Sequence, residues 1–146
     1  MGKLFRMTLS CLFVLFLIPN AALASQEKDS AIANERNWEE VMNAIIQVES
    51  NGDANARRGN SVGAMQITPI LVLECNQILK KRKSKKRFRL SDRLSVAKSK
   101  EMFLLFQSAY NPKNSIERAI RSWNGGLNYS IKCTQRYFEK VMKAMK

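Results

Sequence analysis

Residues 44–68 read AIIQVESNGDANARRGNSVGAMQIT, an apolar run that ends in a single carboxylate, Glu49. The Ser-Asn-Gly at 50–52 is typical of a helix C-terminus, because glycine adopts the left-handed backbone conformation that ends many helices. A second compact segment, GAMQ at 63–66, begins eleven residues after Gly52. A carboxyl group at a helix end beside a glycine turn is a candidate for general acid/base chemistry, but the same pattern fits a polar residue near a helix cap.

Apolar residues recur at helical spacing on both sides of this stretch. The first predicted helix runs from about Arg36 to Gly52, and residues 53–61 are rich in turn formers and predict a surface loop. No segment shows the alternation of a strand. The sequence therefore predicts an all-α fold of about five helices, in one small domain over 36–146.

Four further helices are predicted after the surface loop. The second begins at Pro69, and the third is capped by Ser91 or Ser95 and ends before Asn111-Pro112. The fourth has a capping-box-like start at Asn114, three residues before Glu117. The last begins at about Tyr129, and the residues expected to face inward are Ile131, Tyr137, Phe138, Val141 and Met142.

The N-terminal segment has the anatomy of a secretory signal peptide. Lys3 and Arg6 precede a nearly all-apolar run, Pro19 interrupts it, and the Ala-Leu-Ala at 22–24 is a small-x-small cleavage site. We expect cleavage after residue 24, a flexible leader over 25–35, and export of the mature domain to the periplasm, the cell envelope or beyond. An uncleaved anchor is the alternative, although the apolar run is short for a membrane span.

The formal net charge of +13 is concentrated in one run, since eight of the ten residues from 80 to 89 are Lys or Arg. Like charges at this density predict a solvated loop or a frayed helix end. For an exported protein, the matching partner is the anionic cell envelope, so we predict electrostatic retention there and no specific nucleic acid. Nucleic-acid binding is the alternative, but only Phe88 is available in the run for base stacking.

The sequence contains no histidine, which excludes Ser-His-Asp and Cys-His nucleophile systems and leaves no predicted metal or cofactor site. After signal cleavage the cysteines are Cys75 and Cys133. Export permits a disulfide between them. Two unpaired, packed cysteines are the alternative, and the interpretation favours that alternative slightly.

Four short motifs occur in one order along the chain: Glu49-Ser50, the GAMQ segment at 63–66, WNGG at 123–126, and Tyr137. Together they resemble the soluble lytic transglycosylase (SLT) domain family of the lysozyme-like superfamily, near goose-type lysozyme. Ala64 stands where that family usually has Leu, and Gly125 stands where it usually has Ala. Both are changes between small or apolar residues that leave the backbone and amide chemistry intact.

The resemblance implies a lysozyme-like fold and an exported, monomeric enzyme that acts on peptidoglycan without a cofactor. The reaction would cleave the β-1,4 bond between N-acetylmuramic acid and N-acetylglucosamine, with Glu49 as acid and then base, and would leave 1,6-anhydromuramyl ends. Burial against apolar walls, which we expect Val48, Met65 and Trp123 to supply, would raise the pKa of such an acid. The residues implied in substrate binding are Ser50, Gly63, Ala64, Met65, Gln66, Trp123, Asn124 and Tyr137.

Several alternatives stay open from the sequence. Most glycosidases use two carboxylates, and Asp53 is the nearest second one, although an Asp in a turn usually bonds its own backbone. Water could replace the intramolecular attack and give a hydrolytic, goose-type muramidase. A non-catalytic wall-binding module would keep the cleft without the reaction. Among single residues, Trp123 can be core rather than a sugar platform, and Ser50 or Gln66 can be local caps.

Overall fold

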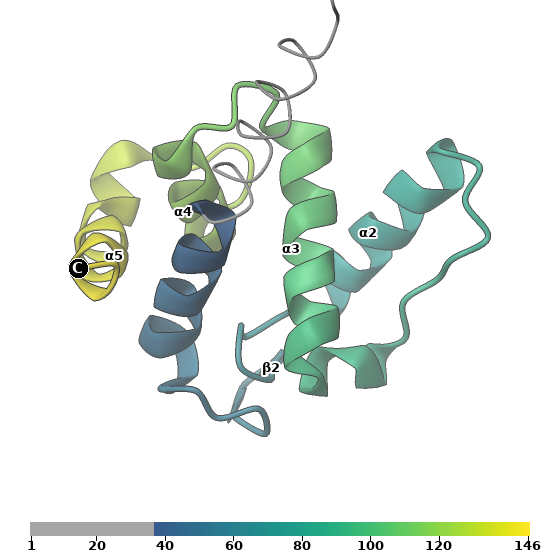
Figure 1. The fold of residues 1–146 in the computed structure, drawn as a ribbon, viewed down its shortest axis with the longest axis horizontal. Coiled ribbons are helices and arrows are strands. Elements are labelled where there is room, and N and C mark those ends of the chain that lie inside the picture. Colours follow the sequence, from purple (N-terminus) through teal and green to yellow (C-terminus); the bar gives the residue numbers. More distant parts are fainter. Residues whose placement is uncertain (1–36) are drawn as a thin grey trace, which may run out of the picture.

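A computed structural model of the chain describes residues 37–146. It opens with a helix over 37–50, followed by an antiparallel hairpin of β1 (Arg57–Arg58) and β2 (Ser61–Val62). The other elements are α2 (Pro69–Lys81), the 3-10 helix η1 (Leu90–Leu94), α3 (Val96–Tyr110), α4 (Ile116–Gly125) and α5 (Ile131–Ala144). The predicted all-α class with about five helices is confirmed for this part of the chain, apart from the small hairpin (Figure 1).

Hydroxyl side chains begin four of the helices. Each accepts a hydrogen bond from the backbone N–H three residues on, which satisfies one of the unpaired donors of a helix start; the four caps are Thr68, Ser95, Ser115 and Ser130. Ser95 is thus the cap of α3, as one of the two predicted choices. The predicted capping box at Asn114 is wrong: Ser115 is the cap of α4, and the Glu117 carboxylate accepts from Arg121 Nε instead.

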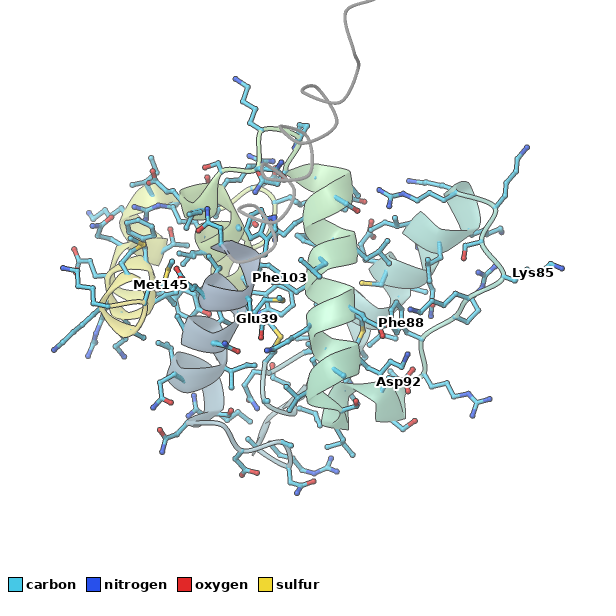
Figure 2. The ribbon with its side chains drawn as sticks, in the orientation of Figure 1. Glu39, Lys85, Phe88, Asp92, Phe103 and Met145 are labelled. Atoms are coloured by element: carbon cyan, nitrogen blue, oxygen red, sulfur yellow. The ribbon has the colours of Figure 1, made fainter. Side chains whose placement is uncertain are left out.

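The core is built around α3, which lies between the 37–50 helix and α2 in Figure 1. Phe103 of α3 is fully buried, and Figure 2 shows its side chain directed toward the 37–50 helix. Its ring meets Trp38 at a centroid distance of 5.9 Å and Trp123 at 5.1 Å, both nearly edge to face. This aromatic contact joins the first described helix, α3 and α4 into one core.

The segment 53–61, predicted as a surface loop, is mostly exposed but contains a short hairpin that the sequence did not predict. Val62 and Ile67 exchange backbone hydrogen bonds of 3.1 and 3.0 Å, which close a turn made of 63–66. The amide of Gly63 also donates to the Ala56 carbonyl at 2.8 Å. Strands of two residues are too short to produce the alternating pattern by which strands are predicted from sequence.

α5 packs against α4, and the buried guanidinium of Arg121 joins the two helices (Figure 1). Its acceptors are Glu117 Oε1, the Ile131 carbonyl, Thr134 Oγ1 and Gln135 Oε1, at 2.7 to 3.1 Å. The inward direction predicted for Ile131 is wrong, since its side chain is 64% exposed. Its backbone carbonyl rather than its side chain meets α4, through Arg121.

The basic run from 80 to 89 ends α2 and continues as a loop whose cations are exposed, as a solvated stretch should be. Phe88 is the exception, with 5% of its surface exposed. The Asn76 side chain donates to the Phe88 carbonyl at 2.9 Å and accepts from the Phe88 amide at 2.8 Å. This pair of bonds ties the loop to α2, while Lys85 points away from the molecule (Figure 2).

Both described cysteines are free: Cys75 is buried and Cys133 is exposed. The slightly favoured interpretation that they do not pair is confirmed, but the packing that it expected of both cysteines is wrong for Cys133. Within 37–146, no helix has the length and apolar character needed to cross a bilayer. The predicted signal peptide at 1–24 and the leader at 25–35 lie outside the described residues.

Candidate active site

Glu49 lies in the last turn of the 37–50 helix and is half-buried. The helix stops after it because Asn51 and Gly52 take left-handed backbone conformations, with φ of 55° and 87°. The Asn51 amide still donates to the Gln47 carbonyl at 3.1 Å, which completes the final turn. The predicted helix end therefore fixes the direction of the carboxyl group that precedes it.

The carboxyl group of Glu49 is held by a residue far away in sequence. The phenol of Tyr137, in α5, donates a hydrogen bond of 2.7 Å to Glu49 Oε1. Burial raises the pKa of Glu49 above its ordinary value of 4.5, while this hydrogen bond and the positive charge of Arg58 act in the opposite direction. Burial also raises the pKa of Tyr137, and the neighbouring carboxylate adds to that shift, so the phenol remains a donor.

The 63–66 turn is fastened to the helix end by Ser50. Its hydroxyl donates to the Ala64 carbonyl at 2.8 Å and also lies 3.2 Å from the Ile46 carbonyl. Ser50 therefore positions the turn next to Glu49, and its hydroxyl is directed at backbone rather than at either cavity described below. The side chains of Ala64 and Met65 are buried in the core, so neither of them lines a cavity beside Glu49.

Gly63 occupies a position that no other residue could fill without a shift of the backbone. Its φ is +84°, and a Cβ added there would lie 1.8 Å from the carbonyl oxygen of Arg93. The turn therefore packs directly on the backbone of η1. The side chain of Arg93 also holds the turn, because its guanidinium donates to the Ile67 carbonyl, at the end of the turn, at 3.2 Å.

Gln66 is the member of the turn that faces the site. Its φ of 51° is unusual for a residue with a side chain. Its amide nitrogen donates to the carbonyls of Gly63 at 2.9 Å and Ala56 at 3.3 Å. These two acceptors fix which end of the amide is nitrogen, and its buried oxygen has no hydrogen-bond partner among the described residues.

Trp123 and Asn124 come from the end of α4. The indole of Trp123 donates to the Met65 carbonyl at 3.3 Å, so Trp123 connects the 63–66 turn to the aromatic core and is half-buried. Asn124 is exposed and borders both cavities beside Glu49. Gly125 is also required by packing, since a Cβ there would lie 2.7 Å from Thr134 Cγ2.

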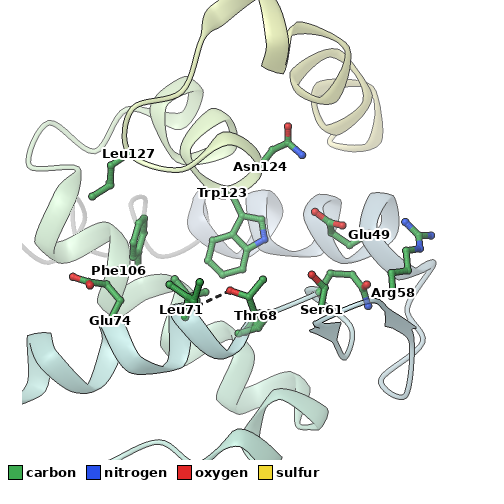
Figure 3. A pocket seen from close by; sticks show the side chains of 13 residues that line it. Glu49, Arg58, Ser61, Thr68, Leu71, Glu74, Phe106, Trp123, Asn124 and Leu127 are labelled. Atoms are coloured by element: carbon green, nitrogen blue, oxygen red, sulfur yellow. Dashed lines mark hydrogen bonds between the residues drawn. The ribbon is translucent and has the colours of Figure 1, made fainter.

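One opening beside Glu49, which we call the main cavity, is shown in Figure 3. Its volume is about 430 Å³. Gln66 and Asn124 line it together with Glu49, and its apolar wall consists of Ile67, Ile70, Leu71, Phe106, Trp123 and Leu127. A concave site with an apolar wall and a few polar groups suits a ligand that has both apolar faces and hydroxyl or amide groups, as sugars do.

A second opening, which we call the basic cavity, has a similar volume of about 430 Å³ on the other side of Glu49. It is lined by Glu49 and Tyr137, by the three cations Arg58, Arg136 and Lys140, and by Val48, Asn124 and Cys133. Arg136 and Lys140 are four residues apart on α5, so they share one face of that helix. Glu49, Arg58 and Asn124 border both cavities and mark the junction between them.

The structure thus brings Glu49, Gln66, Trp123, Asn124 and Tyr137 together, as the motif order predicts. Of the residues expected to form apolar walls, Val48 and Trp123 border the cavities. Met65 borders neither cavity, and its carbonyl group accepts the hydrogen bond from the Trp123 indole. Sequence reasoning missed the cations of the basic cavity. The spacing of Arg136, Tyr137 and Lys140 on one predicted helix was the available signal.

The second carboxylate that lines the site is Glu74, and not Asp53, which was the candidate from the sequence. Asp53 is exposed, lines neither cavity, and accepts from the Asn55 amide at 2.8 Å, which is the local turn bond expected of it. Glu74 of α2 does line the main cavity and accepts a hydrogen bond from the Tyr110 phenol. Figure 3 shows Glu74 and Glu49 at opposite ends of the cavity, with Trp123 and Thr68 between them in that view.

Comparison of the chain with family models, with curated proteins and with solved structures found no match. Among residues 37–146, no group of three or more His, Cys, Asp or Glu side chains is placed to hold a metal ion. The chemistry that the site can perform therefore has to be argued from its own side chains.

Proposed function

We propose that the chain is a peptidoglycan lytic transglycosylase that cleaves the β-1,4 bond between N-acetylmuramic acid and N-acetylglucosamine. The observation that carries this proposal is the position of Glu49: a half-buried carboxyl group, hydrogen-bonded by Tyr137, at the junction of two cavities. The ordered motifs that resemble the SLT domain family support the same assignment, and the turn, α4 and α5 that carry them converge on Glu49.

In the first step Glu49 acts as general acid. Its proton passes to the bridging oxygen while the bond from that oxygen to the muramyl C1 breaks, and positive charge develops on C1. Burial raises the pKa of Glu49, which favours the protonated carboxyl group that this step needs. Tyr137 occupies Oε1, and no described residue donates to Oε2, so Oε2 is the oxygen available to the substrate.

In the second step the Glu49 carboxylate acts as general base. It takes the proton of the muramyl C6 hydroxyl while the C6 oxygen bonds to C1, which closes a 1,6-anhydro ring and restores the protonated acid. The nucleophile is already tethered to the sugar, so the step gains from proximity. A water molecule that attacked C1 instead would give the hydrolytic product and leave Glu49 in the same state.

One carboxyl group is sufficient for this route, which agrees with the arrangement of acids in the site. Asp53 faces its own turn, and Glu74 lies at the far end of the main cavity. Neither is placed beside the carboxyl group of Glu49 in the manner of a paired nucleophile or base. The main cavity would receive the sugar chain, with Trp123, Gln66 and Asn124 along it.

The proposal includes the cellular setting that the sequence predicts. The mature chain would act in the cell envelope after export, where its substrate is found, and the cations of the 80–89 run would hold it on anionic wall polymers. Lys85 of this run lies at the outer edge of the molecule in Figure 2, and no cation of the run lines either cavity beside Glu49. Retention and catalysis are therefore separable.

The test is digestion of purified wall sacculi by the purified chain, with mass analysis of the released fragments. We expect anhydromuramyl products, which are one water lighter than hydrolytic products, and a fall of about a hundredfold or more in rate for Glu49→Gln. Asp53→Asn, an acid outside both cavities, is the matched control and should keep the native rate. Binding of sacculi without any release would identify a non-catalytic wall-binding module instead, and a native rate for Glu49→Gln would remove the assignment.

A further inference from the structure

The basic cavity gathers three cations from two separate parts of the chain around one opening. Arg58 comes from β1, and Arg136 and Lys140 come from α5. Glu49 is the only acidic side chain that lines the opening within the described part of the chain. An excess of positive charge at a concave, largely polar surface attracts an anion.

These three cations have no ion-pair partner within hydrogen-bonding distance among the described residues, unlike several other cations of the domain. Lys86, Lys98 and Lys100 each form an ion pair with a glutamate, and Arg121 is paired with Glu117. Arg58, Arg136 and Lys140 form no ion pair and donate no side-chain hydrogen bond to any residue in 37–146. Their donors are therefore available to a ligand.

We propose that the basic cavity is a subsite for a carboxylate carried by the muramic acid branch of the substrate. This inference rests on the proposed function and adds to it the recognition of an acidic substituent. Muramic acid bears a lactyl ether on C3, two carbons from the C1 atom at which the bond would break, and an acidic peptide is amide-linked to that lactyl group. Either the peptide or a free lactyl group supplies the carboxylate.

Glu49 and Asn124 connect the proposed carboxylate subsite to the main cavity. Both residues border the main cavity and the basic cavity, so a sugar held beside Glu49 lies at the entrance of both. The sugar chain would follow the apolar wall of the main cavity, while its acidic branch would enter the basic cavity. The site would then select acidic muramyl glycans over neutral sugar chains.

The experiment measures binding in a Glu49→Gln background, so that cleavage does not consume the ligand. Three ligands are compared: glycan strands with peptide stems, the same strands after an amidase has removed the stems and exposed the lactyl carboxylate, and a neutral N-acetylglucosamine oligomer. The test variant is Arg136→Gln with Lys140→Gln. The control is Lys132→Gln with Lys143→Gln, which removes the same charge from exposed positions of α5 that line neither cavity.

We expect the test variant to weaken binding of acidic strands by about tenfold and to leave the neutral oligomer unchanged, since two exposed charge contacts together give an effect of this size. A loss confined to strands with stems would assign the carboxylate to the peptide, and a loss confined to the stripped strands would assign it to the lactyl group. A loss for both acidic preparations would mean that either carboxylate fills the subsite. An equal loss for all three ligands, or an equal loss with the control variant, would overturn the subsite.

Cleavage by the native chain is measured separately on the same sacculi. Selective loss of acidic-strand binding without any cleavage by the native chain would support the subsite and contradict the proposed reaction. Cleavage with no difference between the test and control variants would support the reaction and overturn the subsite. The two proposals can therefore fail independently.

Discussion

The phenol of Tyr137 donates a hydrogen bond of 2.7 Å to the carboxyl group of Glu49, across a sequence separation of 88 residues. This contact joins the end of the 37–50 helix to α5 and occupies one of the two carboxyl oxygens, Oε1. Burial raises the pKa of Glu49, and the hydrogen bond partly offsets that effect. The protonation of the acid therefore depends on a residue from the other end of the domain.

Tyr137→Phe should raise the pKa of Glu49 further, because it removes the hydrogen bond that stabilises the anion. An NMR titration of the Glu49 carboxyl carbon measures this directly. If Glu49 acts as general acid, the alkaline limb of the activity profile should move to higher pH by the same amount. Tyr129→Phe is the control, since the Tyr129 phenol makes no hydrogen bond among the described residues. An unchanged or lower Glu49 pKa in Tyr137→Phe would contradict the prediction.

Glu49→Gln should change how the free energy of unfolding depends on pH. The folded-state pKa of Glu49 is raised above its ordinary value of 4.5, so the folded chain binds more protons than the unfolded chain in the window above pH 4.5. Ionisation therefore costs the native chain stability as pH rises through the raised folded-state pKa. Glutamine does not titrate, so the free energy of unfolding of the variant should rise relative to that of the native chain across that window.

Chemical denaturation at a series of pH values tests this expectation. Glu40→Gln, at an exposed position of the same helix, serves as the matched substitution and should follow the native curve. A stability difference between Glu49→Gln and the native chain that is constant from pH 4 to 8 would show that the acid is not desolvated as the structure indicates.

Gly63→Ala should destabilise the domain by about 3 kcal/mol or more, from backbone strain together with the overlap between the new Cβ and the Arg93 carbonyl oxygen. Gly52→Ala separates the two causes. Gly52 has nearly the same φ, +87°, but a Cβ there meets nothing within 4 Å, so we expect about 1 kcal/mol. Denaturant midpoints measure both values. Equal losses at the two glycines would mean that the close backbone approach contributes nothing.

Cys133 and Cys75 should differ sharply in thiol chemistry. Cys133 is exposed beside the cations of the basic cavity, whereas burial raises the pKa of Cys75 to about 12, so almost no thiolate forms there at pH 8. A thiol reagent followed by peptide mapping should label Cys133 rapidly and Cys75 only after unfolding. Cys133→Ser should remove the rapid phase. Rapid labelling of Cys75 in the native chain would show that its thiol is not buried against α3 as the structure indicates.

The exposed cations of the basic run should control retention on the wall without affecting the fold. Replacing Lys80, Lys81, Lys85 and Arg87 by Gln leaves the buried Phe88 and its bonds to Asn76 in place. We expect an unchanged melting temperature and weaker association with wall sacculi, released at lower salt. Identical salt curves for the variant and the native chain would remove a role for the run in retention.

How far the sequence predicts this molecule differs between its parts. Helix ends were predictable where one residue type has a strong local preference, as at Pro69, Ser95 and Gly52. The hairpin was missed because β1 and β2 span two residues each, too few for a pattern. Ile131 was predicted to be buried from its spacing alone, but its carbonyl group is what meets Arg121.

The candidate site shows the same division. Motif order selected Glu49, Gln66 and Asn124, and these residues line one cavity. It did not select Arg58 or Lys140, because a basic side chain in a predicted surface loop or on a polar helix face usually lies in solvent. Their significance depends on which segments meet in space. Nor did the sequence show that the Trp123 indole is committed to the Met65 carbonyl, since tertiary hydrogen bonds leave no local pattern.

The connection between Glu49 and Tyr137 also has a consequence for the order in which the site is assembled. A ribosome releases the 37–50 helix well before it releases α5, and synthesis proceeds at about 5 to 20 residues per second. During those seconds the acid has no phenol beside it, and one wall of the basic cavity does not exist. A nascent chain therefore carries an unfinished site, and any truncation upstream of α5 would leave it so permanently.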